Sequence, residues 1–98
     1  MFLAKVVGTV VASQKHSKFL GMKLLLIQPY VSNDKSLVPQ GSSIVAVDCV
    51  TCGLGDLVMF TQGSSARMTE STKDSPVDAV IIGIVDSVEV GGRGLKKP

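Results

Sequence analysis

The chain has 98 residues, of which 45% are hydrophobic and 18% are charged, and its formal net charge is +2. A chain of this length forms one domain, and its charged fraction lies below the ~25% that is usual in soluble domains. The ten basic and eight acidic residues are scattered, so composition favours neither nucleic acid nor another polyanion as a partner. A domain with little charge and a small core gains stability from association, so we expect another protein chain to cover part of its apolar surface.

Neither a membrane span nor a secretory leader is expected. The longest apolar run, residues 79–85, is far shorter than the ~20 residues that cross a bilayer. Residues 1–4 place no cationic segment in front of an apolar run. We therefore expect synthesis in the cytosol and no membrane partner.

Apolar, β-branched runs alternate with clusters of Gly, Pro, Ser, Asn and Asp along the chain, which is typical of an all-β domain. The strands that this rhythm predicts are residues 2–12, 22–28, 43–50, 57–61 and 77–88. The first and last are the longest, and each contains a glycine, Gly8 or Gly83, at which a barrel can bend sharply. Two long, bent strands in so short a chain indicate a small closed barrel.

The second predicted strand is apolar on both faces, because Leu24 and Leu26 alternate with Leu25 and Ile27. One face can fill the barrel. The other face needs a cover, and in a small all-β chain a neighbouring subunit is the expected one.

The segment before the last strand is rich in Ser and Thr and contains the predicted helical turn, at residues 65–70. Ser64 or Ser65 can cap that turn by accepting a hydrogen bond from a free backbone N–H. Residues 1–90 form the predicted domain, and residues 91–98 have too little apolar content to dock, which predicts a flexible tail. The predicted fold class is therefore all-β, a small OB-like five-stranded barrel with one short helical turn.

Cys49 and Cys52 have the C-x-x-C spacing of redox and metal sites. The sequence has no further cysteine and one histidine, His16, so a four-ligand metal site lacks its second pair of ligands. Cys49 ends a β-branched run, whereas a redox thiol is expected at a helix N-terminus that lowers its pKa. Simple buried thiols are the favoured interpretation, and a redox or metal role, or thiols that face a subunit ring, are the alternatives.

Two glycine-containing segments partly match the motifs of a dinucleotide-binding loop and of a hydrolase nucleophile elbow. Gly-Leu-Gly at residues 53–55 lacks the third glycine of a dinucleotide fingerprint, since Val58 occupies that position, and is interpreted as a tight turn. Gly-Ser-Ser-Ala-Arg at residues 63–67 lacks the second glycine of a hydrolase elbow, since Arg67 stands there. We therefore predict no enzyme, no catalytic residue and no bound cofactor or metal.

Four aspartates, Asp48, Asp56, Asp78 and Asp86, lie near the ends of predicted strands. Their expected role is to cap turns. A paired-carboxylate active site, the alternative, would need two of them to converge.

Several separated motifs occur in one order, at residues 4–10, 48, 53–58, 63–67, 76–79 and 83–86. Together they resemble the vertex proteins of bacterial microcompartment shells, the carboxysome and ethanolamine-utilisation vertex family. The resemblance covers about residues 1–86, which is nearly the whole chain.

The resemblance implies a structural protein with an OB-like barrel. It implies a homopentamer that caps the corners of a cytoplasmic microcompartment and seals its shell with hexameric shell proteins. The residues that it assigns to the subunit interface or the vertex loop are Asp48, Gly53, Gly55, Asp56, Gly63, Ser64, Ser65, Ala66 and Arg67. Arg67 is singled out because a guanidinium can hold two oxygens across an interface, with a solvated side chain as its alternative.

An OB-like barrel can also be a binding module for single-stranded nucleic acid or a small ligand. The aromatic residues are Phe2, Phe19, Tyr30 and Phe60, and they are not interleaved with Lys or Arg. This alternative predicts salt-sensitive binding to single strands.

The composition and the two-sided apolar strand indicate only that the chain associates with another protein chain. The expectation of five subunits comes from the resemblance to the vertex family.

Overall fold

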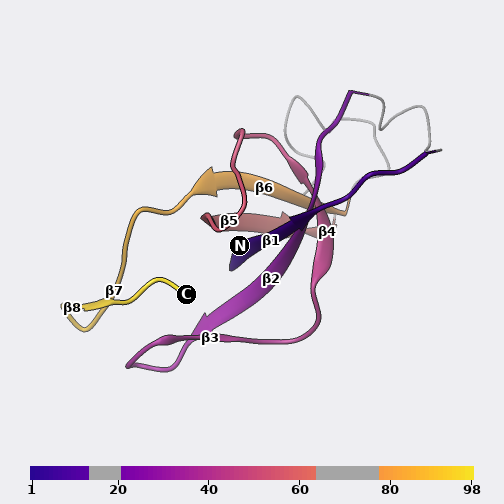
Figure 1. The fold of residues 1–98 in the computed structure, drawn as a ribbon. Coiled ribbons are helices and arrows are strands. Elements are labelled where there is room, and N and C mark those ends of the chain that lie inside the picture. Colours follow the sequence, from indigo (N-terminus) through magenta and orange to yellow (C-terminus); the bar gives the residue numbers. More distant parts are fainter. Residues whose placement is uncertain (14–20, 64–77) are drawn as a thin grey trace.

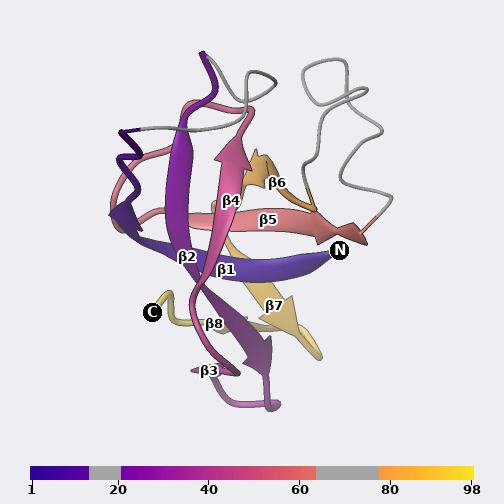
Figure 2. The same cartoon turned by 90° about the vertical axis from the view of Figure 1, so that its right-hand side faces the viewer.

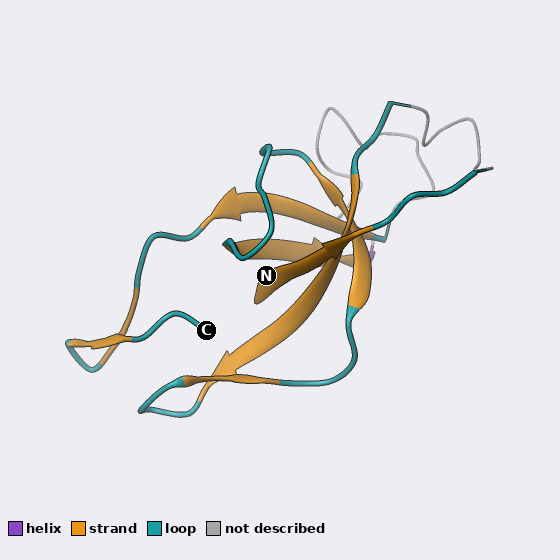
Figure 3. Ribbon diagram, in the orientation of Figure 1, coloured by secondary structure: helices purple, strands orange, loops and turns teal. Residues whose placement is uncertain are grey.

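The computed structural model describes residues 1–13, 21–63 and 78–98. The strands within these ranges are β1 (Phe2–Thr9), β2 (Leu24–Ser32), β3 (Leu37–Pro39), β4 (Ile44–Asp48), β5 (Leu57–Gln62), β6 (Ala79–Ile84), β7 (Val88–Val90) and β8 (Arg93–Leu95) (Figures 1 and 3). In this part of the chain no helix is long and apolar enough to cross a membrane.

Five of the strands close into a barrel. Their order is β1-β5-β6-β4-β2, and pairing between β1 and β2 completes the circle. The β4–β6 pair is parallel and the other barrel pairs are antiparallel. Strand β3 adds to β2 outside the circle. The predicted all-β, five-stranded OB-like barrel is thereby confirmed, whereas the predicted helical turn at residues 65–70 lies outside the described residues.

The barrel interior is a continuous apolar core. Its largest fully buried side chains include Phe60, Leu25, Ile27 and Ile81. Alternation along each strand places every second side chain inside, so Leu25 and Ile27 point inward as the sequence predicts. Burial of these apolar side chains stabilises the barrel.

A second, smaller cluster lies on the other face of the sheet, around Val47 and Val80. Leu24 pairs with Val47 in the β2–β4 register and packs against this cluster. Leu24 is therefore partly covered within its own chain. The uncovered part of this face is centred on Leu26, which is half-buried.

Both strand glycines lie beside irregularities in strand pairing. The β1–β2 register shifts between Val6 and Gly8, and the β5–β6 register shifts where Gly83 pairs with Met59. A Cβ at Gly83 would lie 2.8 Å from Met59 Cε, whereas one at Gly8 would stay 3.7 Å from Leu26. The glycines thus mark bends, as predicted. A Cβ at Gly83 would displace only the flexible end of the Met59 side chain, so the crowding there is modest.

The C-terminal segment corrects the sequence prediction of one long last strand and an undocked tail. The last barrel strand ends at Ile84, and residues 88–95 form the β7–β8 hairpin beside β3 (Figure 2). Gly91 and Gly92, with φ of 58° and 79°, supply the two positive φ values of a type I′ turn. Leu95 is 7% exposed and docks in a third cluster with Leu37 and Leu57. Three-residue strands are too short to show alternation, so the sequence contains no sign of them. The prediction of a flexible tail therefore depends on composition alone and is wrong.

Candidate subunit-contact surface

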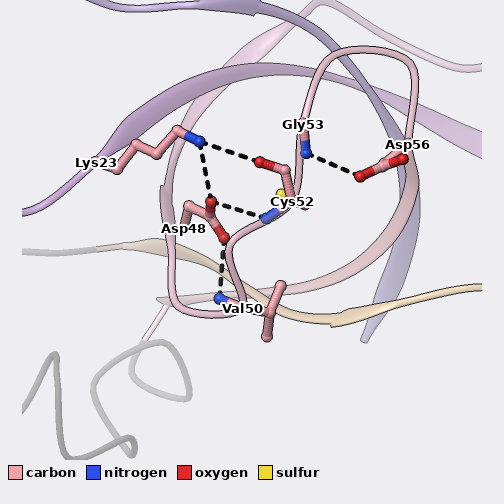
Figure 4. A network of polar contacts seen from close by, with 6 residues as sticks. All are labelled: Lys23, Asp48, Val50, Cys52, Gly53 and Asp56. Atoms are coloured by element: carbon pink, nitrogen blue, oxygen red, sulfur yellow. Dashed lines mark hydrogen bonds and ion pairs between the residues drawn. The ribbon is translucent and has the colours of Figure 1, made fainter.

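Asp48, at the end of β4, organises the loop that follows it (Figure 4). Its carboxylate accepts hydrogen bonds from the backbone N–H groups of Val50, at 2.9 Å, and Cys52, at 3.0 Å. Lys23 Nζ lies 3.7 Å from Asp48 Oδ2 and donates a hydrogen bond of 3.1 Å to the Cys52 carbonyl. The Asp48 side chain is 1% exposed, so the predicted turn-capping role takes place in a buried setting.

The loop that Asp48 holds contains a strained residue. Thr51 has a φ of 59°, which is unusual for a β-branched side chain. The two N–H groups bonded to Asp48 belong to the residues on either side of Thr51. The surrounding bonds therefore stabilise a conformation that Thr51 alone disfavours.

Cys52 lies beside Asp48 in this loop and is a buried thiol. The pKa of Cys52 is raised from 9.0 to about 11, mainly by burial and further by the charge of Asp48 and a hydrogen bond to its carboxylate. The thiol is therefore protonated at neutral pH, and a protonated thiol is neither a nucleophile nor a metal ligand. The buried-thiol interpretation holds for Cys52, whereas Cys49 is only half-buried and packs at the edge of the second cluster.

The neighbouring Gly53–Asp56 turn is closed by hydrogen bonds and docked on β1. Gly53 N donates to Asp56 Oδ2 at 2.8 Å, and Asp56 N donates to the Gly53 carbonyl at 3.1 Å. Gly55 has a φ of 88° and its N–H donates to the Val6 carbonyl at 2.9 Å. Leu54, at the tip of the turn, is 76% exposed. The turn therefore presents one leucine to the surroundings on a fixed backbone.

The structure brings four of the predicted surface residues together, namely Asp48, Gly53, Gly55 and Asp56. Gly63 lies elsewhere, after β5, where its N–H donates to the Asp78 carbonyl at 2.9 Å. Ser64, Ser65, Ala66 and Arg67 fall outside the described residues. A contact role for all nine stays a prediction.

The sequence analysis missed two residues of this site, Lys23 and Thr51. Lys23 lies immediately before β2, and nothing in its local sequence pairs it with Asp48. Thr51 has no local signal for a positive φ either, because glycine or asparagine is the usual residue there. Among residues 1–13, 21–63 and 78–98, no group of three His, Cys, Asp or Glu side chains could hold a metal ion.

Comparison with known proteins decides the family. The family model described as "Ethanolamine utilisation protein EutN/carboxysome" matches residues 1–86. The chain belongs to this family. An EutN/carboxysome relative, the bacterial microcompartment shell vertex protein GrpN of Rhodospirillum rubrum, is 43% identical over 91% of this chain and 97% of its own. The carboxysome shell vertex protein CcmL of Gloeobacter violaceus is 43% identical over 97% of this chain and 92% of its own.

Solved structures of EutN/carboxysome proteins share the barrel. Gloeobacter violaceus CcmL superposes with a TM-score of 0.88 at 42% identity, covering 99% of this chain and 97% of its own. GrpN from Rhodospirillum rubrum, described as a pentameric microcompartment shell protein, superposes with a TM-score of 0.80 at 43% identity. It covers 92% of this chain and 99% of its own. The resemblance read from the sequence is confirmed at the level of the family.

Proposed function

We propose that this chain is a shell vertex protein, which assembles as a closed ring of five and occupies the corners of a bacterial microcompartment in the cytoplasm. The observation that carries the proposal is the similarity to the pentameric GrpN structure, at 43% identity and a TM-score of 0.80. The proposed work of the protein is structural, in keeping with relatives that are described as shell vertex proteins, among them GrpN, CcmL and EutN.

The geometry of a ring explains what the barrel must supply. A ring requires a heterologous contact, in which one patch of a subunit meets a different patch of the next, with a rotation that closes after one turn. A flat net of hexagonal tiles cannot enclose a volume, because closure requires five-sided positions. Hexameric shell proteins are therefore the proposed partners of the pentamer.

The described surface gives more support to this role than to nucleic-acid binding. Binding of single strands uses several exposed aromatic side chains on which bases stack. Phe60 is 2% exposed inside the barrel, and Tyr30 packs in the third cluster. Among the aromatic residues in the described ranges only Phe2, which is 54% exposed, faces solvent.

Two measurements test the proposal. Native mass spectrometry of the purified chain is expected to show a ring of five, and a monomer at micromolar concentration would contradict it. Shells made from hexameric shell proteins alone are expected to be open or permeable to a small fluorescent solute, and co-production of this chain is expected to seal them. Unchanged permeability would argue against the vertex role even if the ring forms.

A further inference from the structure

We propose that neighbouring subunits meet by packing an apolar strip of one copy into an apolar hollow at the N-terminus of the next. The inference rests on the proposed ring and assigns its two complementary patches. The strip consists of Val7, Leu26, Val45 and Leu54. The hollow is lined by Met1, Phe2, Leu3 and Met59.

The strip crosses four successive elements on the outside of the barrel. Leu26 pairs with Gly8 on one side and with Val45 on the other, so these positions share one face. Val7 is the extra residue of the β1 bulge beside Gly8. The Gly53–Asp56 turn is hydrogen-bonded to the backbone of Val6, which places Leu54 next to this bulge.

The strip is exposed and uncharged. Val7, Val45 and Leu54 are 40%, 47% and 76% exposed, and Leu26 is half-buried. Gly8 has no side chain, and the Leu26 side chain lies 3.7 Å from where a Cβ of residue 8 would stand, so Leu26 packs close to the β1 backbone. A contiguous aliphatic surface of this kind is typical of a protein–protein contact.

The hollow lies at the other end of β1. It has a volume of about 220 Å³, and its most exposed lining residues are Met1, at 80%, and Phe2, at 54%. The Phe2 ring packs against the Phe60 ring with centroids 5.5 Å apart, which holds Phe2 in place. The hollow is open to the surroundings and apolar, so it can receive part of the leucine side chain of a neighbour.

The positions of the two patches favour a ring rather than a symmetric dimer. Leu3 and Val7 are four residues apart on β1, which is roughly 13 Å at the rise of an extended strand. One copy therefore presents the strip and the hollow at different places. Contact between unlike patches is heterologous, and a closing heterologous contact generates a ring.

Charge placed in either patch tests the inference. Leu54→Lys alters the strip and Phe2→Lys alters the hollow, and both positions are exposed, so the barrel is expected to fold. Val31→Lys is the matched control, because Val31 is an exposed β2 valine, 38% accessible, that belongs to neither patch. Native mass spectrometry is expected to show five-subunit rings for wild type and Val31→Lys and loss of the ring for the other two. Circular dichroism confirms folding of each variant.

Covalent capture tests which patch meets which. In a Cys49→Ala, Cys52→Ala background, the pair Leu54→Cys and Phe2→Cys is treated with a short bismaleimide. A ladder that ends at five linked subunits is expected, whereas Leu54→Cys paired with Val31→Cys is expected to give no ladder.

The two proposals fail in different ways. A wild-type chain that is monomeric overturns the proposed ring. If wild type forms the ring, two results overturn the assignment of strip and hollow while leaving the ring intact. One is a five-subunit ring in folded Leu54→Lys, and the other is the absence of a cross-linked ladder in the Leu54→Cys, Phe2→Cys variant.

Discussion

Asp48 connects parts of the chain that are far apart in sequence. Its ion pair with Lys23 is a small term, because the Lys23 side chain is 51% exposed and exposed pairs contribute about 0 to 1 kcal/mol. The two hydrogen bonds that Asp48 accepts from backbone N–H groups contribute more, because buried hydrogen bonds to a charged carboxylate are stronger than exposed ion pairs. Asp48 therefore fixes the loop that leads into the Gly53–Asp56 turn and its exposed leucine.

Replacing Asp48 by alanine is expected to lower the free energy of unfolding by about 2 to 4 kcal/mol. The reason is that the N–H groups of Val50 and Cys52 lose their acceptor, and each unsatisfied buried donor costs about 1 to 3 kcal/mol. Urea denaturation measures the change. All variants are compared at one protein concentration, because assembly shifts apparent stability.

Lys23→Ala is the control for Asp48→Ala, since it removes the ion pair and the partly buried Lys23 hydrogen bond to the Cys52 carbonyl but leaves both N–H groups bonded to Asp48. Its expected cost is no more than about 1 kcal/mol. Equal losses for Lys23→Ala and Asp48→Ala would show that the contacts of Lys23, not backbone capping by Asp48, stabilise this loop.

At the scale of elements, the β7–β8 hairpin is a cover for the outside of the barrel. Leu95 joins Leu37 of β3 and Leu57 of β5 in one cluster, with Val88 and Val90 packed against it. Figures 1 and 2 show the hairpin and β3 at the same end of the molecule. A segment that seems polar in sequence thus protects an apolar part of the barrel wall.

Leu95→Ala is expected to reduce the free energy of unfolding by about 2 to 3 kcal/mol, at the low end for a buried leucine because the cluster is peripheral. Lys97→Ala, an exposed change in the same tail, is expected to stay within about 0.5 kcal/mol. Thermal or urea unfolding measures both. If the two variants have equal stability, Leu95 does not dock in solution.

The sequence predicts the barrel strands because each alternates or is uniformly apolar over at least five residues. It does not predict β3, β7 or β8, since a three-residue strand such as Arg93–Leu95 has no period to detect. The predicted last strand, residues 77–88, runs past Ile84 because Val85 is also apolar. In the structure Val85 N donates to the Leu57 carbonyl at 2.8 Å and the chain then leaves the barrel.

The candidate site is predictable only where its signal is local. Asp48 and the Gly53–Asp56 turn are recognised from turn chemistry, because Asp and Gly have specific roles in tight turns. The contact between Lys23 and Asp48 cannot be predicted in this way, because the two residues are 25 positions apart and are brought together by the β2–β4 pairing. The strip also depends on strand register, so Val7, Leu26 and Val45 become one surface only in the folded barrel.

At the scale of the whole molecule, the two proposed patches explain why a chain with 18% charged residues gains from forming a ring. Both patches are built from aliphatic, aromatic and methionine side chains. Burying them against each other removes apolar area from water, which stabilises association by roughly 25 cal/mol per Å² before the costs of ordering. The ring is therefore expected to depend on apolar contact rather than on ion pairs.

Salt separates these two sources of stability. Raising NaCl from about 0.1 M to about 1 M shortens the Debye length from about 10 Å to about 3 Å and weakens exposed ion pairs, whereas excluded salts such as sulfate strengthen apolar association. We expect the five-subunit species to persist in 1 M NaCl and in ammonium sulfate, as measured by sedimentation velocity. Leu54→Lys, expected to be monomeric in 0.1 M NaCl, is the reference for the dissociated state. Dissociation of the wild-type ring in 1 M NaCl, with the barrel still folded, would show that charged side chains hold it together.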